Sequence, residues 1–242
     1  MIKWLIIILL AVPRIIYSEI VLLIMNANKE KYPLEKRYNV VRNTCLWVCK
    51  LTRTRFNIIN EDVINNYSEK GRLFVSNHLS VYDAITMVAL SKKPLIFISK
   101  KENSKVPFLT THMKAIDTIC IDRESVKQSL KVCKDAGIKV KEGHDIVLYA
   151  EGTRSKDGNV APFKAALPTI VHYCESDVVL VCIHDSKVPL KFRVITYPKE
   201  HVNIKFFKPL PYTYYLENRK EFSILTHDLI QEQIDIYKKG EK

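Results

Sequence analysis

A histidine and an aspartate five residues apart recur three times along the 242-residue chain. Such a pair suits general acid–base chemistry, because the carboxylate can bind one imidazole nitrogen while the other nitrogen takes a proton. Inside one α-helix this spacing leaves the two side chains roughly 140° apart, so the pair requires an intervening turn. The three pairs are His78 with Asp83, His112 with Asp117, and His172 with Asp177.

Only the first pair has the context that such a turn requires. His78 follows an apolar run at 72–76, and Asp83 is a residue type that favours the start of a helix. His172 lies inside an expected helix, and His112 follows no buried strand. We therefore predict His78 as a general base oriented by Asp83, with a structural loop histidine as the alternative. Because the chain contains no GxSxG sequence, a substrate hydroxyl would attack directly.

A second polar junction, Glu151-Gly152-Thr153-Arg154, follows the apolar run 145–150. Gly152 permits a turn conformation that other residues resist. Exposed backbone N–H groups, the Thr153 hydroxyl and the Arg154 guanidinium would together suit a phosphate. Glu151 could orient the arginine or accept a hydrogen bond from a glycerol hydroxyl. A charged turn with an Arg–Glu pair is the alternative.

Two further cations stand where apolar runs end, Lys100 after 94–99 and Arg123 after 118–122. Lysine and arginine at such positions are by default solvated surface charges. Their repeated place at strand ends favours a common crevice with the turn at Gly152.

The elements that must position these residues alternate along the chain. Several apolar runs lack polar alternation, which indicates strands covered on both faces. The fold class is therefore α/β, a mostly parallel central sheet flanked by helices. We expect strands at 72–76, 94–99, 118–122, 145–150, 178–183, 192–196 and 202–207, and helices at 83–90, 124–141, 164–175 and 221–237, with a helical or irregular segment at 106–115.

The amino-terminal segment is apolar at 4–13 and 15–25, interrupted by Arg14 and Glu19. It is long enough to span a bilayer if the two charges compensate each other, or it lies partly in one leaflet; a buried core helix is the third alternative. Basic residues follow it, so the positive-inside rule places the next domain on the cytoplasmic face of the membrane. We expect a membrane-docking module at 1–57 and a catalytic domain at 58–242.

Charge and cysteine content exclude other classes. The net charge of +12 suits an anionic bilayer or small molecule, and no nucleic-acid-binding motif accompanies it. The six cysteines form no CxxC pair, so we expect reduced thiols and no metal site.

Taken together, these residues resemble the glycerolipid acyltransferase family, which includes the 1-acyl-sn-glycerol-3-phosphate acyltransferases. The resemblance covers roughly residues 70 to 185 and depends on the order of four blocks. They are NHLSVYD at 77–83; SKKE at 99–102 with VPF at 106–108 and IDR at 121–123; EGTRS at 151–155 with DG at 157–158 and FK at 163–164; and the run 178–183.

The resemblance implies acyl transfer from acyl-CoA or acyl carrier protein to the free hydroxyl of 1-acyl-sn-glycerol 3-phosphate, giving phosphatidic acid. His78 would be the base and Asp83 its partner. The substrate-binding set would be Asn77, Lys100, Arg123, Glu151, Gly152, Thr153 and Arg154. No metal or redox cofactor is implied, and the expected partners are the bilayer, the lysophospholipid and the acyl donor, without nucleic acid.

The chain departs from the family pattern at Thr110, Ala150 and Ala166, and at Leu180 or Val181. These positions shape the crevice in relatives, so they bear on the acyl chain and the acceptor. The same chemistry on another lysophospholipid, glycerol phosphate or a lyso-aminolipid is one alternative function. A non-catalytic lipid-binding relative is the other.

Overall fold

The computed structural model describes residues 2–66, 70–187 and 201–240, with side chains from residue 12 onward. Two helices, α1 (Ile2–Ala27) and α2 (Leu34–Leu51), precede the sheet domain. The strands are β1 (Arg55–Ile59), β2 (Leu73–Ser76), β3 (Leu95–Lys100), β4 (Ile119–Ile121), β5 (Asp145–Tyr149), β6 (Val178–His184) and β7 (His201–Phe206). The other helices are α3 (Glu61–Asn65), α4 (Tyr82–Leu90), η1 (Lys101–Lys105), α5 (Pro107–Ala115), α6 (Val126–Lys141), α7 (Ala166–Cys174), α8 (Tyr212–Glu217) and α9 (Phe222–Lys238).

The described strands form one sheet in the order β1-β7-β6-β2-β5-β3-β4. All neighbouring pairs are parallel except β6 with β7, which is antiparallel. Strand β2 therefore lies between β5 and β6, and the loop after β2 leaves from the middle of the sheet. The expected α/β class with a mostly parallel sheet is confirmed.

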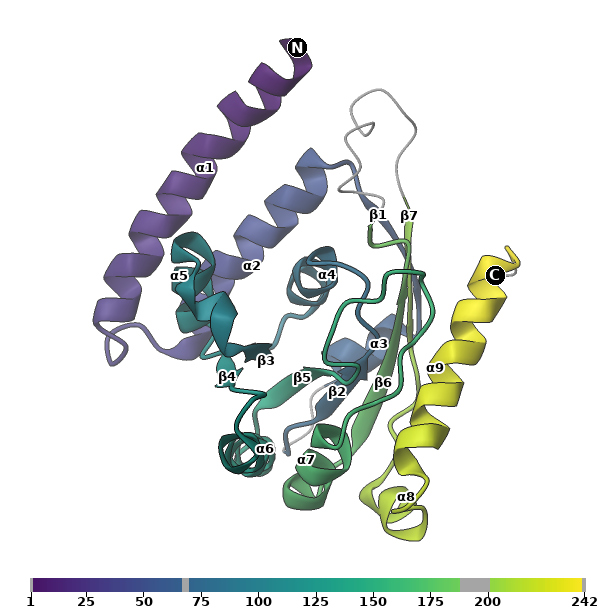
Figure 1. The fold of residues 1–242 in the computed structure, drawn as a ribbon. Helices are drawn as coiled ribbons and strands as arrows, with labels where there is room; N and C mark the ends of the chain where they lie inside the picture. Colours follow the sequence, from purple (N-terminus) through teal and green to yellow (C-terminus); the bar gives the residue numbers. More distant parts are fainter. Residues whose placement is uncertain (1, 67–69, 188–200, 241–242) are drawn as a thin grey trace.

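Helices cover both faces of the sheet (Figure 1). Buried side chains of α1, α2 and α4 join one hydrophobic core with alternate strand residues such as Phe74 and Val147. Those of α6, α7 and α9 join a second core with Leu73 and Ile146. Because successive strand residues face opposite sides, strands covered on both faces are apolar throughout, as the sequence indicates.

The expected strands and helices lie within one to three residues of the observed elements, except that the run 192–196 falls outside the described residues. Strand β1 and helices α3, η1 and α8 were not expected from the sequence. Strand β1 forms one edge of the sheet and alternates between exposed and half-buried residues, so it has no continuous apolar run. The expected domain boundary at residue 57 falls inside this strand.

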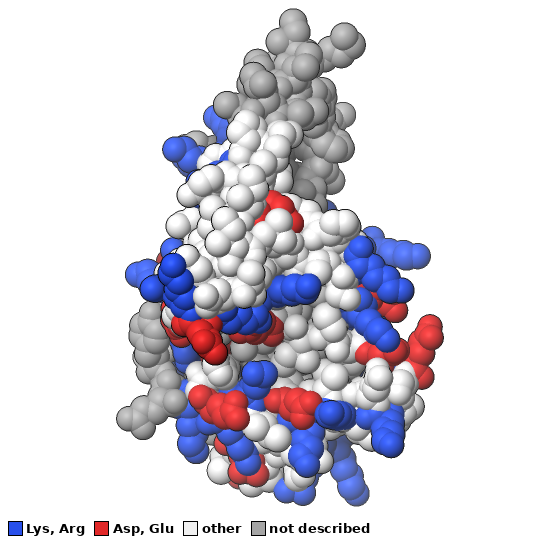
Figure 2. Space-filling model, turned by 90° about the vertical axis from the view of Figure 1, so that its left-hand side faces the viewer, with Lys and Arg blue, Asp and Glu red and all other residues white. Residues whose placement is uncertain are grey.

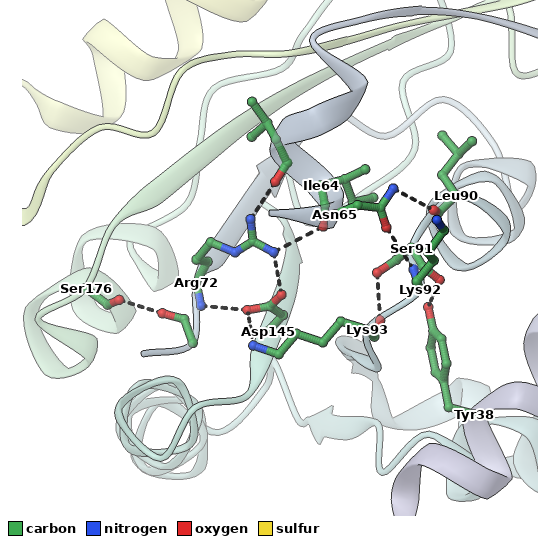
Figure 3. A network of polar contacts seen from close by, with 12 residues as sticks. Tyr38, Ile64, Asn65, Arg72, Leu90, Ser91, Lys92, Lys93, Asp145 and Ser176 are labelled. Carbon is green, nitrogen blue, oxygen red and sulfur yellow. Dashed lines mark hydrogen bonds and ion pairs between the residues drawn. The ribbon is translucent and has the colours of Figure 1, made fainter. Parts of the chain in front are cut away.

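A buried ion pair joins the amino-terminal ends of β2 and β5 (Figure 3). The Arg72 guanidinium lies 2.8 Å from Asp145 and also donates to the Val63 and Ile64 carbonyls at the end of α3. Lys93 approaches the same carboxylate at 3.3 Å. These contacts satisfy buried charges and free helix carbonyls at the end of the sheet opposite the β2–α4 loop.

Helix α1 has one buried and one exposed apolar face. Ser18, Leu22 and Met25 are buried against the domain. The Glu19 carboxylate accepts a hydrogen bond from the Thr111 hydroxyl of α5, and among the described contacts it makes no pair with Arg14. The compensating pair considered from the sequence is therefore not formed.

The opposite face of α1 carries exposed apolar side chains. They are Val12, Ile16, Tyr17, Ile20, Leu23 and Ile24, each between 43% and 59% exposed. Within the described parts of the chain, no helix combines the length and apolar character needed to cross a bilayer. The membrane-anchoring role expected of this segment stays a prediction.

Candidate active site

The loop between β2 and α4 holds His78 beside Asp83. The His78 Nδ1 atom lies 2.7 Å from the Asp83 Oδ2 atom, and the carboxylate is fully buried. The same oxygen accepts the backbone N–H groups of Leu79 at 2.7 Å and Ser80 at 2.9 Å. A carboxylate in the first turn of a helix thus closes the loop that carries the histidine.

This arrangement sets the imidazole tautomer. With its Nδ1 facing a carboxylate, the neutral ring carries its proton there, and Nε2 is left as the basic nitrogen. Among the described residues, Nε2 has no hydrogen-bond partner. The contact of His78 with Asp83 expected from their spacing is therefore present, and the role of His78 as a general base stays a prediction.

Tyr149, the last residue of β5, supports the imidazole from one side. Its ring stacks on that of His78 with 4.2 Å between centroids and 16° between planes. Its hydroxyl is buried and has no partner among the described residues, and burial raises the Tyr149 pKa well above its ordinary value. Nothing in the sequence indicated this contact, because the stacking depends on the pairing of β5 with β2.

Glu151 holds the main chain of the site. Its Oε1 atom accepts the His78 N–H at 2.7 Å, and Oε2 accepts the Ala161 N–H at 2.8 Å. Burial raises the pKa of Glu151, and the two N–H groups oppose that rise. Glu151 is 1% exposed and thus joins the histidine loop to the segment at Ala161, while its expected part in binding substrate stays a prediction.

Asn77, expected from the sequence to bind substrate, makes two hydrogen bonds to the main chain of β6. Its side-chain amide donates to the Ile183 carbonyl at 2.8 Å and accepts the Ile183 N–H at 2.8 Å. Asn77 is buried, so these two bonds tie the β2–α4 loop to β6. This is again a positioning role, one residue before the base.

The predicted cations lie at neighbouring strand ends on one side of His78. Lys100 ends β3, while Arg123 and Arg154 follow β4 and β5, and all three side chains are exposed. Gly152 has a φ of +74°, and a Cβ built there would lie 3.9 Å from the Arg123 guanidinium carbon. The structure thus brings Arg123 to the Gly152 turn, where Thr153 is also exposed.

Lys164 is a further cation at this turn, and its Cγ atom lies 3.5 Å from the same Cβ position. Its backbone N–H donates to the Ala150 carbonyl at 2.9 Å, which fixes the following segment against the turn. The signal available in the sequence was the Phe163-Lys164 pair of the third block.

The other two histidine–aspartate pairs are not formed among the described contacts. The Asp117 carboxylate binds Arg37 and Lys29, and His112 faces Glu19. His172 is exposed on α7. No group of three or more His, Cys, Asp or Glu side chains in the described part of the chain gathers as metal ligands would.

Comparison with known proteins places the site within a family. The family model described as acyltransferase matches residues 55–188, more than half of the chain and all of the loops described above. A 1-acyl-sn-glycerol-3-phosphate acyltransferase of Helicobacter pylori is 34% identical over 110 residues, 44% of this chain and 45% of that protein. A probable enzyme of the same name from Mycoplasma genitalium is 29% identical over 162 residues, 63% of this chain and 59% of that protein. The chain thus spans less than two thirds of the length of these relatives.

A solved structure has a similar fold. The crystal structure of the 1-acyl-sn-glycerophosphate (LPA) acyltransferase PlsC from Thermotoga maritima superposes with a TM-score of 0.69. The match covers 95% of each chain at 19% sequence identity. It therefore extends across the helices before residue 55 as well as the sheet.

Proposed function

Because the chain belongs to the acyltransferase family, we propose that it moves a fatty acyl group from a thioester donor to the free hydroxyl of 1-acyl-sn-glycerol 3-phosphate. The product is phosphatidic acid. The observation that carries the proposal is the 2.7 Å contact of His78 Nδ1 with the buried Asp83 carboxylate, inside the matched region. The names of the relatives from Helicobacter pylori and Mycoplasma genitalium support the choice of acceptor.

The reaction needs one proton transfer in each direction. His78 Nε2 takes the proton from the acceptor hydroxyl as the hydroxyl oxygen attacks the thioester carbonyl carbon. The new C–O bond forms, the C–S bond breaks, and the imidazolium returns the proton to the leaving sulfur. Asp83 stabilises the imidazolium between these steps. One hydroxyl and one thioester become one ester and one thiol, so the balance requires no redox cofactor.

The acceptor phosphate is assigned to the cations at the Gly152 turn. Arg123 and Lys164 lie against this turn, and Arg154 is part of it. Guanidinium groups bind phosphate through paired, charge-assisted hydrogen bonds. A phosphate held there would place the glycerol hydroxyl toward His78, whose loop joins the same turn through Glu151.

The acceptor and the acyl product are lipids, so the chain would work at a bilayer. The apolar face of α1 would enter the headgroup region (Figure 2). Phe108 and Leu109 of α5, the helix packed against α1, are also exposed and would add to it. Lysine and arginine side chains border this face, as anionic headgroups would favour. We place the catalytic domain on the cytoplasmic side of that membrane. Acyl-CoA and acyl carrier protein are both candidate donors.

The proposal is tested by an acyl-transfer assay on the full chain in detergent, with 1-oleoyl lysophosphatidic acid and both donors. His78→Ala should lower kcat by at least about a hundredfold, because the general base is lost. His172→Ala, which removes an exposed histidine of α7, is the matched control and should retain activity.

Three outcomes would contradict the proposal. Full activity of His78→Ala would exclude this residue as the base. Transfer to glycerol 3-phosphate or another lysophospholipid, with none to lysophosphatidic acid, would show that the proposed acceptor is wrong. The proposed acyl-transfer reaction would still hold. If no acceptor is acylated, a non-catalytic lipid-binding function follows.

A further inference from the structure

A cavity of ≈ 290 Å³ adjoins the catalytic loop on its β6 side. Leu79, the residue after the base, forms one wall, and the loops after β5 and β6 form others. The Ser155 N–H donates to the His78 carbonyl at 2.7 Å, so the loop after β5 is fixed directly to the catalytic loop. A ligand in this cavity would therefore lie next to the base.

The cavity wall is basic. Lys156, Lys187 and Lys238 line it, opposed by the carboxylates of Asp157 and Asp185. Both carboxylates face partners of their own. Asp157 accepts hydrogen bonds from Asn159 and from the Ser155 hydroxyl, and Asp185 lies 3.2 Å from His184 Nδ1.

The three lysines differ in what they bind. The Lys187 ammonium donates to the Ser155 carbonyl at 2.7 Å, and that of Lys238 donates to the Asn159 side chain. Both therefore hold the shape of the loop. Within the described residues, the Lys156 ammonium makes no hydrogen bond or ion pair, so it is the charge best placed to meet an anionic ligand.

The cavity lies toward β6, whereas Lys100 and Arg123 lie toward β4. His78 follows β2; on one side β3 and β4 carry these two cations at their ends, and on the other side β6 leads into Asp185 and Lys187. The loop after β5 contributes to both sides, with Arg154 before and Lys156 after the Ser155 N–H that binds the His78 carbonyl. Basic side chains therefore lie on both sides of His78. This arrangement suits a transfer between two phosphorylated substrates, because each must bring its reacting group to the same imidazole.

We propose that the cavity binds the phosphorylated pantetheine arm of the acyl donor, with Lys156 meeting its phosphate. This inference rests on the proposed acyl transfer and adds the donor site to it. Coenzyme A and acyl carrier protein share the phosphopantetheine arm, so either could supply it. The volume suits one end of the donor, with the thioester directed past Leu79 to His78.

The test compares the full-length chain with Lys156→Glu, using palmitoyl-CoA and palmitoylated acyl carrier protein in turn. The KM for whichever of these donors the parent chain uses should rise about tenfold. This is the effect of losing one charge-assisted contact. The KM for lysophosphatidic acid should stay within about twofold, whereas Arg154→Ala should raise the acceptor KM and spare the donor KM.

Lys208→Glu is the matched control, because Lys208 is an exposed lysine after β7, at the opposite end of the sheet. Its donor KM should equal that of the parent chain. Thermal unfolding of each variant separates a binding effect from a loss of fold. A larger change in the acceptor KM than in either donor KM, or equal effects of Lys156→Glu and Lys208→Glu, would overturn the proposal.

Calorimetric titration with coenzyme A itself needs no turnover. Weaker binding to Lys156→Glu than to the parent chain supports the donor site for coenzyme A. If coenzyme A affinity is unchanged and only the carrier-protein KM rises, the cavity serves the carrier-bound arm. If the parent chain binds coenzyme A but acylates no acceptor, the proposed function is wrong. The comparison of coenzyme A affinity between the parent chain and Lys156→Glu still tests whether the cavity binds the donor. If neither donor responds to Lys156→Glu, the inference is wrong.

Discussion

At the scale of single residues, His78, the proposed base, is held in place by several groups besides Asp83. Glu151 bonds the His78 N–H, Asn77 ties the preceding residue to β6, and Tyr149 stacks on the imidazole. Each removes freedom from the histidine without taking up Nε2. Such support matters because a misplacement of about 1 Å can cost around a hundredfold in rate.

Tyr149 gives a prediction at this scale. Tyr149→Leu should lower kcat about tenfold with little change in either KM, because the imidazole loses the flat surface that fixes its plane. Tyr149→Phe should retain most of kcat, since the ring remains and the buried hydroxyl has no partner among the described residues. Steady-state kinetics of both variants, with kcat followed against pH, make the measurement. Equal losses of kcat in the two variants would show that the hydroxyl of Tyr149 matters, not its ring. An unchanged kcat in Tyr149→Leu would show that stacking on His78 has no role.

At the scale of elements, the α1–α2 hairpin is fastened to the turn between α5 and β4. The buried Arg37 guanidinium lies 2.8 Å from Asp117 and also donates to the Lys114 and Ala115 carbonyls. Lys29, beyond the end of α1, binds the same carboxylate. Two helices that come early in the sequence are thereby joined to the sheet domain by one aspartate.

The Asp117 carboxylate makes this attachment dependent on pH. Burial raises the pKa of Asp117, but bonds from Arg37 and Lys29 outweigh burial and lower the pKa below its ordinary value of 3.8. A lowered carboxyl pKa adds stability that is complete above that ordinary value and is lost as the pH falls through the folded-state pKa. The loss is therefore expected below about pH 4.

Asp117→Asn should lower the free energy of unfolding by about 1.5–3 kcal/mol at neutral pH, the contribution of hydrogen bonds to charged groups. Asparagine tolerates the positive φ of this position, so the backbone should adapt without strain. Urea unfolding at neutral pH and near pH 3 makes the measurement, and the difference between the two chains should shrink at the lower pH. If the difference in unfolding free energy between the two chains is the same at both pH values, Asp117 acts through packing instead of charge.

At the scale of the whole molecule, the exposed apolar face of α1 and the catalytic loop belong to one body. Helix α2 buries Tyr38 and Val41 in the same core as α4. Deleting residues 1–57 would remove these core residues and part of β1, so it would confuse membrane release with unfolding. Substitutions on the exposed face separate the two effects.

Ile20→Glu combined with Ile24→Glu should weaken binding to vesicles at least about tenfold, because two apolar contacts become charges facing an anionic surface. Sedimentation with phosphatidylcholine–phosphatidylglycerol vesicles gives the partition. Ile224→Glu, an equally exposed apolar position at the start of α9, is the control and should not change binding. Unchanged binding of the double variant would show that α1 is not the docking face.

The sequence by itself determined the fold class and the contact of His78 with Asp83, because both are local in the chain. Continuous apolar runs indicate strands covered on both faces. A histidine and an aspartate on either side of a strand–helix turn are brought into contact by that turn alone. The tertiary structure decided the roles of Glu151, Asn77 and Tyr149, since their partners at Ala161, Ile183 and His78 meet them only after distant strands pair. It also decided that basic side chains lie on both sides of His78. Sheet order places them there, and sheet order is set by long-range pairing that no local spacing records.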